Sequence, residues 1–188
     1  PSLMLKRFNT RQLVFMALMG AVFFLMDFLV STAVDAATGV PGAGYAVVSV
    51  LFIALATLAG LILEKFGMIT IMALIYAIIA IPTPVYGPPG LFKVAMAVAT
   101  GLIMDLIIAG FSFRKIGFYL GMAIGNMASV LLYVWTGRLL GLPGTEALVA
   151  SMWLFTVIYG IEAVPGVWIG YFVHNRIKHK PIVRQIRG

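Results

Sequence analysis

The chain has no cysteine, few charged residues and only two histidines. Charged side chains make up 10% of its 188 residues. The lack of cysteine excludes disulfides, thiolate metal sites and cysteine nucleophiles. The low charge excludes a disordered chain, which needs low hydrophobicity and high net charge. His174 and His179 are five residues apart and form no His-Glu-x-x-His pattern, so neither a zinc hydrolase nor a serine-histidine protease is expected.

A nucleotide-binding motif is also missing from the sequence. No Gly-x-x-x-x-Gly-Lys-Ser/Thr phosphate loop occurs in the chain. Any dependence on ATP must therefore come from partner proteins. The chain is not expected to be an enzyme, and its residues imply neither a cofactor nor a metal.

Apolar residues dominate what is present. The residues AVILMFWYC account for 62% of the chain and glycine adds 20 residues more, against about 45–50% for the combined set in soluble domains. The expected fold is an all-α integral membrane protein, a single domain over residues 1–188 that forms a six-helix bundle. Because a spanning helix needs about 20 residues, the expected spans cover about 12–34, 44–63, 67–81, 91–110, 116–137 and 147–173, followed by a basic tail at 174–188.

The third expected span is too short to cross a bilayer alone. It is followed by Pro82-Thr-Pro-Val-Tyr-Gly-Pro-Pro-Gly90, which contains four prolines and is not expected to be helical. Inside a membrane, such backbone is tolerated only where it is buried in protein or lines a wet cavity. An irregular outer loop after the third span is therefore predicted.

The basic residues divide unequally between the two sides of the predicted bundle. Eleven of the thirteen lie on the side that holds both termini, and only Lys93 and Arg138 lie on the other. By the positive-inside rule, both termini are expected in the cytoplasm of a cell whose plasma membrane the chain spans. The basic tail is interpreted as an orientation signal that contacts lipid headgroups, and nucleic acid is not expected as a partner. The first apolar run, about 23 residues without a small-residue cleavage site, is interpreted as a span and not as a signal peptide.

Small residues recur at helical spacing in three of the predicted spans. The fifth carries Gly117, Gly121 and Gly125, and the sixth carries Gly166 and Gly170. Because helices in lipid associate through close packing of small residues, these stripes predict contacts within the bundle. The first span places Ala17, Gly20 and Ala21 on one face of its cytoplasmic half.

Together with short sequence motifs, these features carry a family resemblance. The motifs are a basic start over 6–11, Ala17-x-x-x-Ala21, the Gly87-Pro-Pro-Gly-Leu-Phe-Lys93 start of the fourth span, and Thr100-Gly-Leu-Ile-Met-Asp105 within it. The chain resembles the substrate-binding S component of energy-coupling factor (ECF) vitamin transporters over nearly its whole length. The resemblance implies that the Ala17, Gly20 and Ala21 face contacts a transmembrane T component driven by two ABC ATPases. It also implies a substrate cavity near the outer surface.

Polar residues inside the predicted spans are the candidate substrate-binding groups, because buried acids in a membrane usually face a partner or a cavity. Asp27 and Glu162 are expected to contact either the cavity or a structural partner, which would be Lys93 or a buried hydroxyl. Lys93 itself either binds substrate or extends toward lipid headgroups. The candidate set is Asp27, Tyr86, Lys93, Asn126, Tyr133, Trp153, Tyr159 and Glu162. Asp105 is expected instead in an ion pair with the Arg114-Lys115 loop at the inner rim.

Two functions of different classes follow. The first is a high-affinity binding subunit for a vitamin or a related organic micronutrient. Aromatic residues beside carboxylates would suit a flat heterocycle such as thiamin or its pyrimidine precursor, with riboflavin or another vitamin left open. The second is a stand-alone carrier or channel that uses Asp27 or Glu162 as an ion relay. No repeat relates residues 12–110 to 116–173, which favours the binding subunit.

Overall fold

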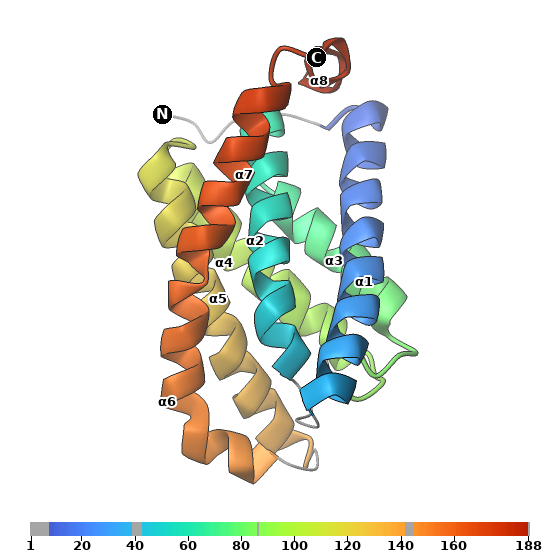
Figure 1. Ribbon diagram of the computed structural model, residues 1–188, viewed down its shortest axis with the longest axis vertical. Coiled ribbons are helices and arrows are strands. Elements are labelled where there is room, and N and C mark those ends of the chain that lie inside the picture. The colour runs from blue at the N-terminus through green and yellow to red at the C-terminus, as the bar shows by residue number, and fades with distance from the viewer. Residues whose placement is uncertain (1–7, 39–42, 86, 142–144, 188) are drawn as a thin grey trace.

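The computed structural model describes residues 8–38, 43–85, 87–141 and 145–187 of the chain. Within these ranges the protein is helical and contains no strand (Figure 1). The helices are α1 (Thr10–Thr38), α2 (Ala43–Leu63), α3 (Met68–Ala80), α4 (Phe92–Gly110), α5 (Lys115–Leu139), α6 (Thr145–Ile161), α7 (Ala163–Ile177) and α8 (Pro181–Arg187).

Helix α2 lies between the N-terminal and C-terminal parts of the bundle. It packs against α1 on one side and α7 on the other, while α4 packs between α3 and α5, and α5 packs against α6. The main core forms where these helices meet, around the fully buried Ile53, Met72, Met104 and Met122.

Four helical segments are long and apolar enough to cross a membrane. They are Thr10–Val34, Phe92–Gly110, Lys115–Leu139 and Val149–Ile177, and the two shorter apolar segments are Val47–Leu63 and Met68–Ala80. Large apolar side chains also cover the outside of the bundle, for example Leu29 on α1 and Trp168 on α7. An outer surface of this kind suits lipid. The prediction of an all-α fold is confirmed for the described residues, and the apolar helices are compatible with a membrane protein.

The prediction of six helices is wrong for the described residues. The last expected span is divided at Glu162 into α6 and α7, and an additional helix, α8, forms in the expected tail. The division has a local cause: Pro165 has no N–H to donate to the carbonyl of Ile161. Helix α8 begins at Pro181, the position where a proline suits a helix start.

The first span is also longer than expected. Helix α1 continues to Thr38, although the expected span ended at about residue 34. Ala36 and Ala37 favour a helix, and the first glycine comes only at position 39. The helix therefore continues up to the residue before the glycine at 39, because the residues that follow position 34 still favour a helix.

The short third span is confirmed. Helix α3 has 13 residues, a length of roughly 20 Å at ~1.5 Å per residue, which is less than the ~30 Å hydrocarbon core. Described residues between 81 and 91 form turns, and the N–H of Gly90 donates to the carbonyl of Ile81 at 3.1 Å. Gly87 has a φ of +97°, in the region that favours glycine.

The glycine stripes make contacts within the bundle, as predicted. A Cβ on Gly125 would lie 2.2 Å from the Met104 side chain of α4, and one on Gly166 would lie 2.6 Å from Ile53 of α2. The absence of a side chain at these positions lets α5 approach α4 and lets α7 approach α2.

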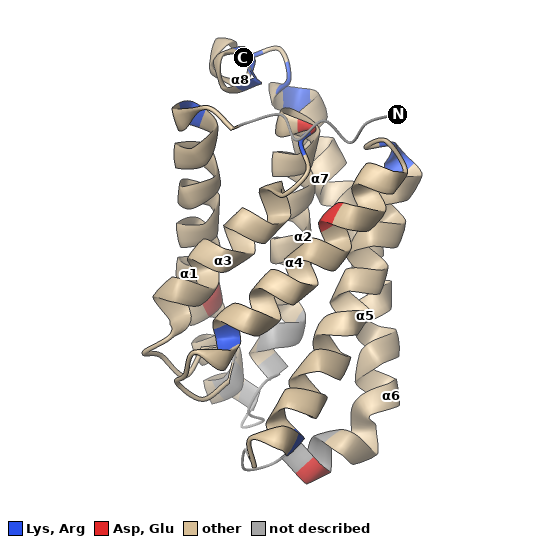
Figure 2. Cartoon of the chain, turned by 180° about the vertical axis from the view of Figure 1, so that it is seen from behind, with Lys and Arg blue, Asp and Glu red and all other residues tan. Residues whose placement is uncertain are grey.

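The two ends of the bundle differ in charge. Figure 2 shows Lys and Arg gathered mainly at the end where α8 lies, with few at the opposite end. The start of α1 lies at the α8 end, because the side-chain amide of Gln12 donates to the carbonyls of Ile186 and Arg187 at 3.1 and 3.3 Å. We call this the basic end and the other the loop end, since it holds the 81–91 segment.

Candidate functional site

Asp27 lies on α1 in the interior of the bundle and is 1% exposed. Its carboxylate accepts hydrogen bonds from the hydroxyls of Ser31 and Tyr76, each at 2.5 Å. Ser31 is one turn further along α1, whereas Tyr76 comes from α3. A buried carboxylate needs such donors in a membrane, where water does not solvate it.

Glu162 forms a second polar cluster at the junction of α6 and α7. Its carboxylate accepts a hydrogen bond from the hydroxyl of Ser49 on α2 and lies 3.5 Å from the side-chain nitrogen of Asn126 on α5. Asn126 also donates to the backbone carbonyl of Tyr159 on α6 at 2.8 Å. Three helices therefore meet through polar groups at the point where the last span is interrupted.

Lys93 is fully buried at the start of α4 and is not extended toward headgroups. Its ammonium group donates to the carbonyl oxygens of Ala80, Thr83 and Val85 at 2.9, 2.6 and 2.6 Å. An ammonium group has three donors, so all three hold the end of α3 and the turn that follows it. The side chain is therefore a structural support of the irregular segment.

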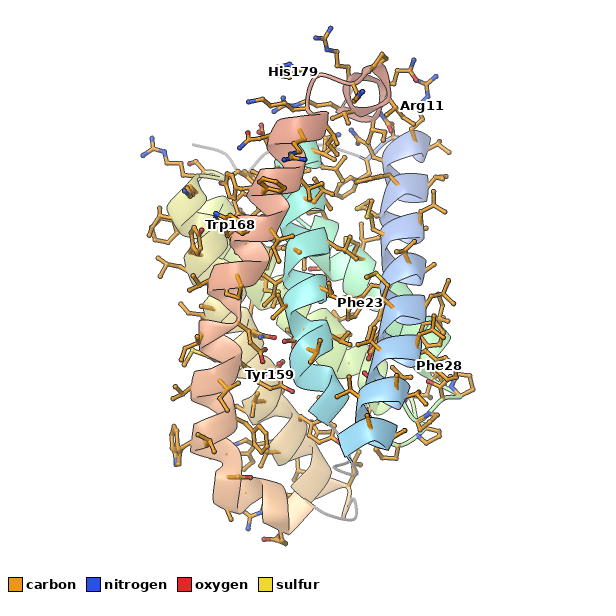
Figure 3. All side chains as sticks on the ribbon, viewed as in Figure 1. Arg11, Phe23, Phe28, Tyr159, Trp168 and His179 are labelled. Carbon is orange, nitrogen blue, oxygen red and sulfur yellow. The ribbon has the colours of Figure 1, made fainter. Side chains whose placement is uncertain are left out.

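A cavity of about 30 Å³ lies between the Asp27 and Glu162 clusters. Tyr76, which donates to Asp27, and Asn126, which lies beside Glu162, both line it. The wall also includes Phe23, which points from α1 into the bundle (Figure 3). A cavity of this size suits one water molecule and is far below the ~300–1,000 Å³ of typical small-molecule pockets.

Thr100 on α4 also lines the cavity, and its hydroxyl has no hydrogen-bond partner among the described residues. The hydroxyl of Thr57 is in the same situation but does not line the cavity. A buried hydroxyl without a partner is costly. The cavity offers Thr100 the space for such a partner, with Ser129 on α5 close enough to line the same wall.

The aromatic candidates are placed unequally. Trp153 is 71% exposed on the outer face of α6 and does not join the cluster. Tyr159 is half-buried on the side of α6 that faces the bundle (Figure 3). Tyr133 is half-buried beside Gly87, where an added Cβ would lie 2.9 Å from its hydroxyl oxygen. Tyr86 lies outside the described residues.

Asp105 has a different partner from the one expected. Its carboxylate accepts from the backbone N–H groups of Ile69 and Thr70, at 3.3 and 2.9 Å, and from the Thr70 hydroxyl at 2.7 Å. These donors belong to the first turn of α3, whose N-cap, Gly67, has no side chain to satisfy them. The expected ion pair with Arg114 and Lys115 is therefore wrong, and Asp105 caps α3.

The small residues on α1 separate into two environments. Gly20 is buried against α3, where an added Cβ would lie 2.8 Å from the carbonyl oxygen of Met72. Ala17 and Ala21 are half-buried beside the exposed apolar face of the helix. Close packing on α3 thus uses Gly20, while the two alanines remain partly accessible.

Several partners in the site carried little signal in the sequence. Ser31 follows Asp27 by four residues, a spacing that places two side chains on one helix face. Ser49 is 113 residues from Glu162, and Tyr76 is 49 residues from Asp27. Serine and tyrosine are common in membrane spans, so these long-range pairs could be found only from the packing of the helices.

No protein-family model, curated protein or solved structure matches the chain. In the ranges that the structure describes, no group of three histidine or acidic side chains is placed to hold a metal ion. The site consists of two hydrogen-bonded carboxylates with a small cavity between them, close to the irregular 81–91 segment. Its groups suit hydrogen bonding to a small polar molecule.

Proposed function

We propose that the protein is the substrate-binding membrane subunit of an ECF-type importer for a vitamin or related organic micronutrient. The observation that carries the proposal is a cavity inside an apolar bundle that is lined by Tyr76 and Asn126, the hydrogen-bond partners of Asp27 and Glu162. Polar groups inside a membrane are expensive and usually mark a binding site or pathway. The missing phosphate loop agrees with a subunit that depends on partner ATPases.

The size of the cavity sets a requirement on the mechanism. About 30 Å³ does not hold a vitamin, so binding requires the bundle to open at the loop end. The junction at Glu162 and the turns after α3 are two of the places where the helices are interrupted. We infer that substrate enters there and replaces the hydrogen bonds that Asn126 and Glu162 now make with the protein.

Coupling to a T component is proposed for the exposed face of α1 that borders Ala17 and Ala21. Their small side chains would let a partner helix approach closely. Gly20 contributes indirectly, because it keeps α1 packed on α3. Under this proposal, the coupling face and the polar site occupy different parts of α1, so substitutions separate them.

The test is uptake of a vitamin mixture by cells that express the chain with or without a T component and ATPases from the same organism. Accumulated vitamins are measured by mass spectrometry. Accumulation is expected only with the partners, and Ala17→Trp should abolish it while substrate affinity changes less than a few-fold. Leu29→Trp, at an exposed position near the other end of α1, is the matched control. Accumulation by the chain alone would refute the proposal.

A stand-alone carrier or channel is the second candidate. The observation that favours it is that the cavity has the size of one water and joins the partners of both carboxylates. Asp27 and Glu162 would then relay a proton or cation through a water molecule held in the cavity. Transport by the purified chain in liposomes, driven by an ion gradient and lost in Asp27→Asn, would establish this function.

A further inference from the structure

A second and much larger pocket lies at the basic end of the bundle. It has a volume of about 380 Å³ and is formed where the ends of α2 and α7 meet α8. Leu61, Ile62 and Val183 provide its apolar part. This volume is within the range of small-molecule sites, and the pocket is separate from the polar cavity described above.

Five nitrogen-bearing side chains line the same pocket, and none of the described acidic residues does. They are His174, Lys178, His179, Arg184 and Arg187. Figure 3 shows His179 at the same end of the molecule as Arg11. The pocket therefore concentrates positive charge and hydrogen-bond donors against an apolar wall.

Only part of this charge is neutralised within the protein. Arg187 donates to the carboxylate of Glu64 at 2.7 Å. Lys178 contacts the neutral side chain of Asn175 at 3.3 Å. Neither Lys178 nor Arg184 has a carboxylate within ion-pair distance in the described ranges. An anion in the pocket would meet at least two uncompensated cations.

The wall that carries these cations is held in place. The side-chain amide of Gln12 on α1 donates to the carbonyls of Ile186 and Arg187 on α8. Lys65 in turn donates to the side-chain oxygen of Gln12 at 2.7 Å. The side chain of Val183, on α8 itself, is buried. These contacts make the pocket a preformed part of the fold.

We propose that this pocket binds a phosphate group. Arginine and lysine are the side chains that bind phosphate best, arginine through paired hydrogen bonds. The apolar wall and the position at the ends of the helices suit the headgroup and first carbons of an anionic phospholipid, since basic pockets at the cytoplasmic ends of membrane helices bind such headgroups. A soluble phosphate compound shares the same chemistry. The site does not depend on the importer function.

The test uses the purified full chain in detergent. Binding of phosphatidylglycerol, phosphatidylcholine and inorganic phosphate is measured by native mass spectrometry and by the shift of the melting temperature at constant ionic strength. The variant Lys178→Gln with Arg184→Gln removes the two uncompensated cations. The matched control is Arg114→Gln with Lys115→Gln, which removes two exposed charges outside the pocket. Lys115 lies near the Tyr171 ring of α7 and so belongs to the same end.

Phosphatidylglycerol is expected to bind the wild type and the control alike, and to bind the pocket variant at least fivefold more weakly. Phosphatidylcholine should bind weakly to all three. Binding of inorganic phosphate that is lost in the same variant would identify a soluble ligand and would also support the site.

Equal loss in both double variants, or loss in neither, would overturn the proposal, because general surface charge would then explain the binding. If the pocket variant does not fold, His179→Glu serves as the second test. This exposed residue lines the pocket without holding α8, so the added negative charge should weaken phosphatidylglycerol binding while the melting temperature of the lipid-free protein stays unchanged. Unaltered binding in that variant would refute the site.

Discussion

The side chain of Asn126 on α5 donates a hydrogen bond to the backbone carbonyl of Tyr159 on α6, at 2.8 Å. The same nitrogen lies 3.5 Å from the carboxylate of Glu162. One amide therefore connects the fifth span to the interruption between α6 and α7. Under the proposed function, substrate in the polar cavity would contact this amide, because Asn126 lines the cavity.

Asn126→Ala is expected to weaken substrate binding by roughly 1–3 kcal/mol, because a buried acceptor on the substrate would lose the Asn126 amide as its donor. The free energy of unfolding without ligand should also fall, since the Tyr159 carbonyl and the Glu162 carboxylate both lose their contact with the amide. Calorimetric titration and denaturant unfolding in detergent measure the two effects. The exposed Ile124→Ala is the control on the same helix. Unchanged affinity in Asn126→Ala would remove Asn126 from the site.

Lys93→Met is expected to destabilise the protein by roughly 3 kcal/mol, because three carbonyl oxygens lose a charged donor. Lys180→Met, at an exposed position, should change the free energy of unfolding by less than about 0.5 kcal/mol. Denaturant unfolding of both variants gives the comparison. Equal stability of the two would show that the Ala80, Thr83 and Val85 carbonyls do not depend on Lys93.

Asp105→Asn is expected to lower the stability by about 1–2 kcal/mol, the usual effect of losing a helix cap. An asparagine side chain has one acceptor oxygen for donors that the carboxylate now divides between two. Substrate affinity should not change, because Asp105 caps α3 and does not line the polar cavity. A loss of affinity without a loss of stability would instead assign Asp105 to the site.

Thr100→Val and Thr57→Val form a matched pair. Each removes a buried hydroxyl that has no partner among the described residues, so each should leave the ligand-free stability unchanged or raise it slightly. Only Thr100 lines the cavity, so only Thr100→Val should weaken substrate binding, by roughly 1–3 kcal/mol. Titration of both variants with substrate separates them. Equal affinities would show that the cavity does not receive the substrate.

Much of the helical organisation was readable from the sequence, because it follows from local chemistry. The length of apolar runs predicted where helices lie, and the four prolines after Ile81 predicted the end of α3. The glycine spacing predicted close packing on α4 and α2, which the structure confirms. The extension of α1 to Thr38 was missed, because a following Gly or Pro marks a helix end only approximately. The formation of the short helix α8 was also missed.

The site was readable only in part. The high cost of polar groups inside a membrane singled out Asp27, Asn126 and Glu162. Asn126 lines the cavity, whereas Asp27 and Glu162 are connected to it through Tyr76 and Asn126. The roles of Lys93 and Asp105 depend on backbone groups of other helices, whose positions a sequence does not give. Trp153 was chosen for its aromatic ring, but an aromatic residue near a membrane boundary faces lipid as readily as a ligand.

The most direct test of the proposed function is the identity of the small molecule that copurifies with the detergent-solubilised full chain. Wild-type protein and Glu162→Gln are purified in parallel, and the extracted molecules are measured by mass spectrometry. We expect one vitamin-like organic compound at close to one molecule per chain in the wild type, and a much smaller amount in Glu162→Gln. A wild-type preparation without such a compound, which also takes up none from an added vitamin mixture, would contradict the account.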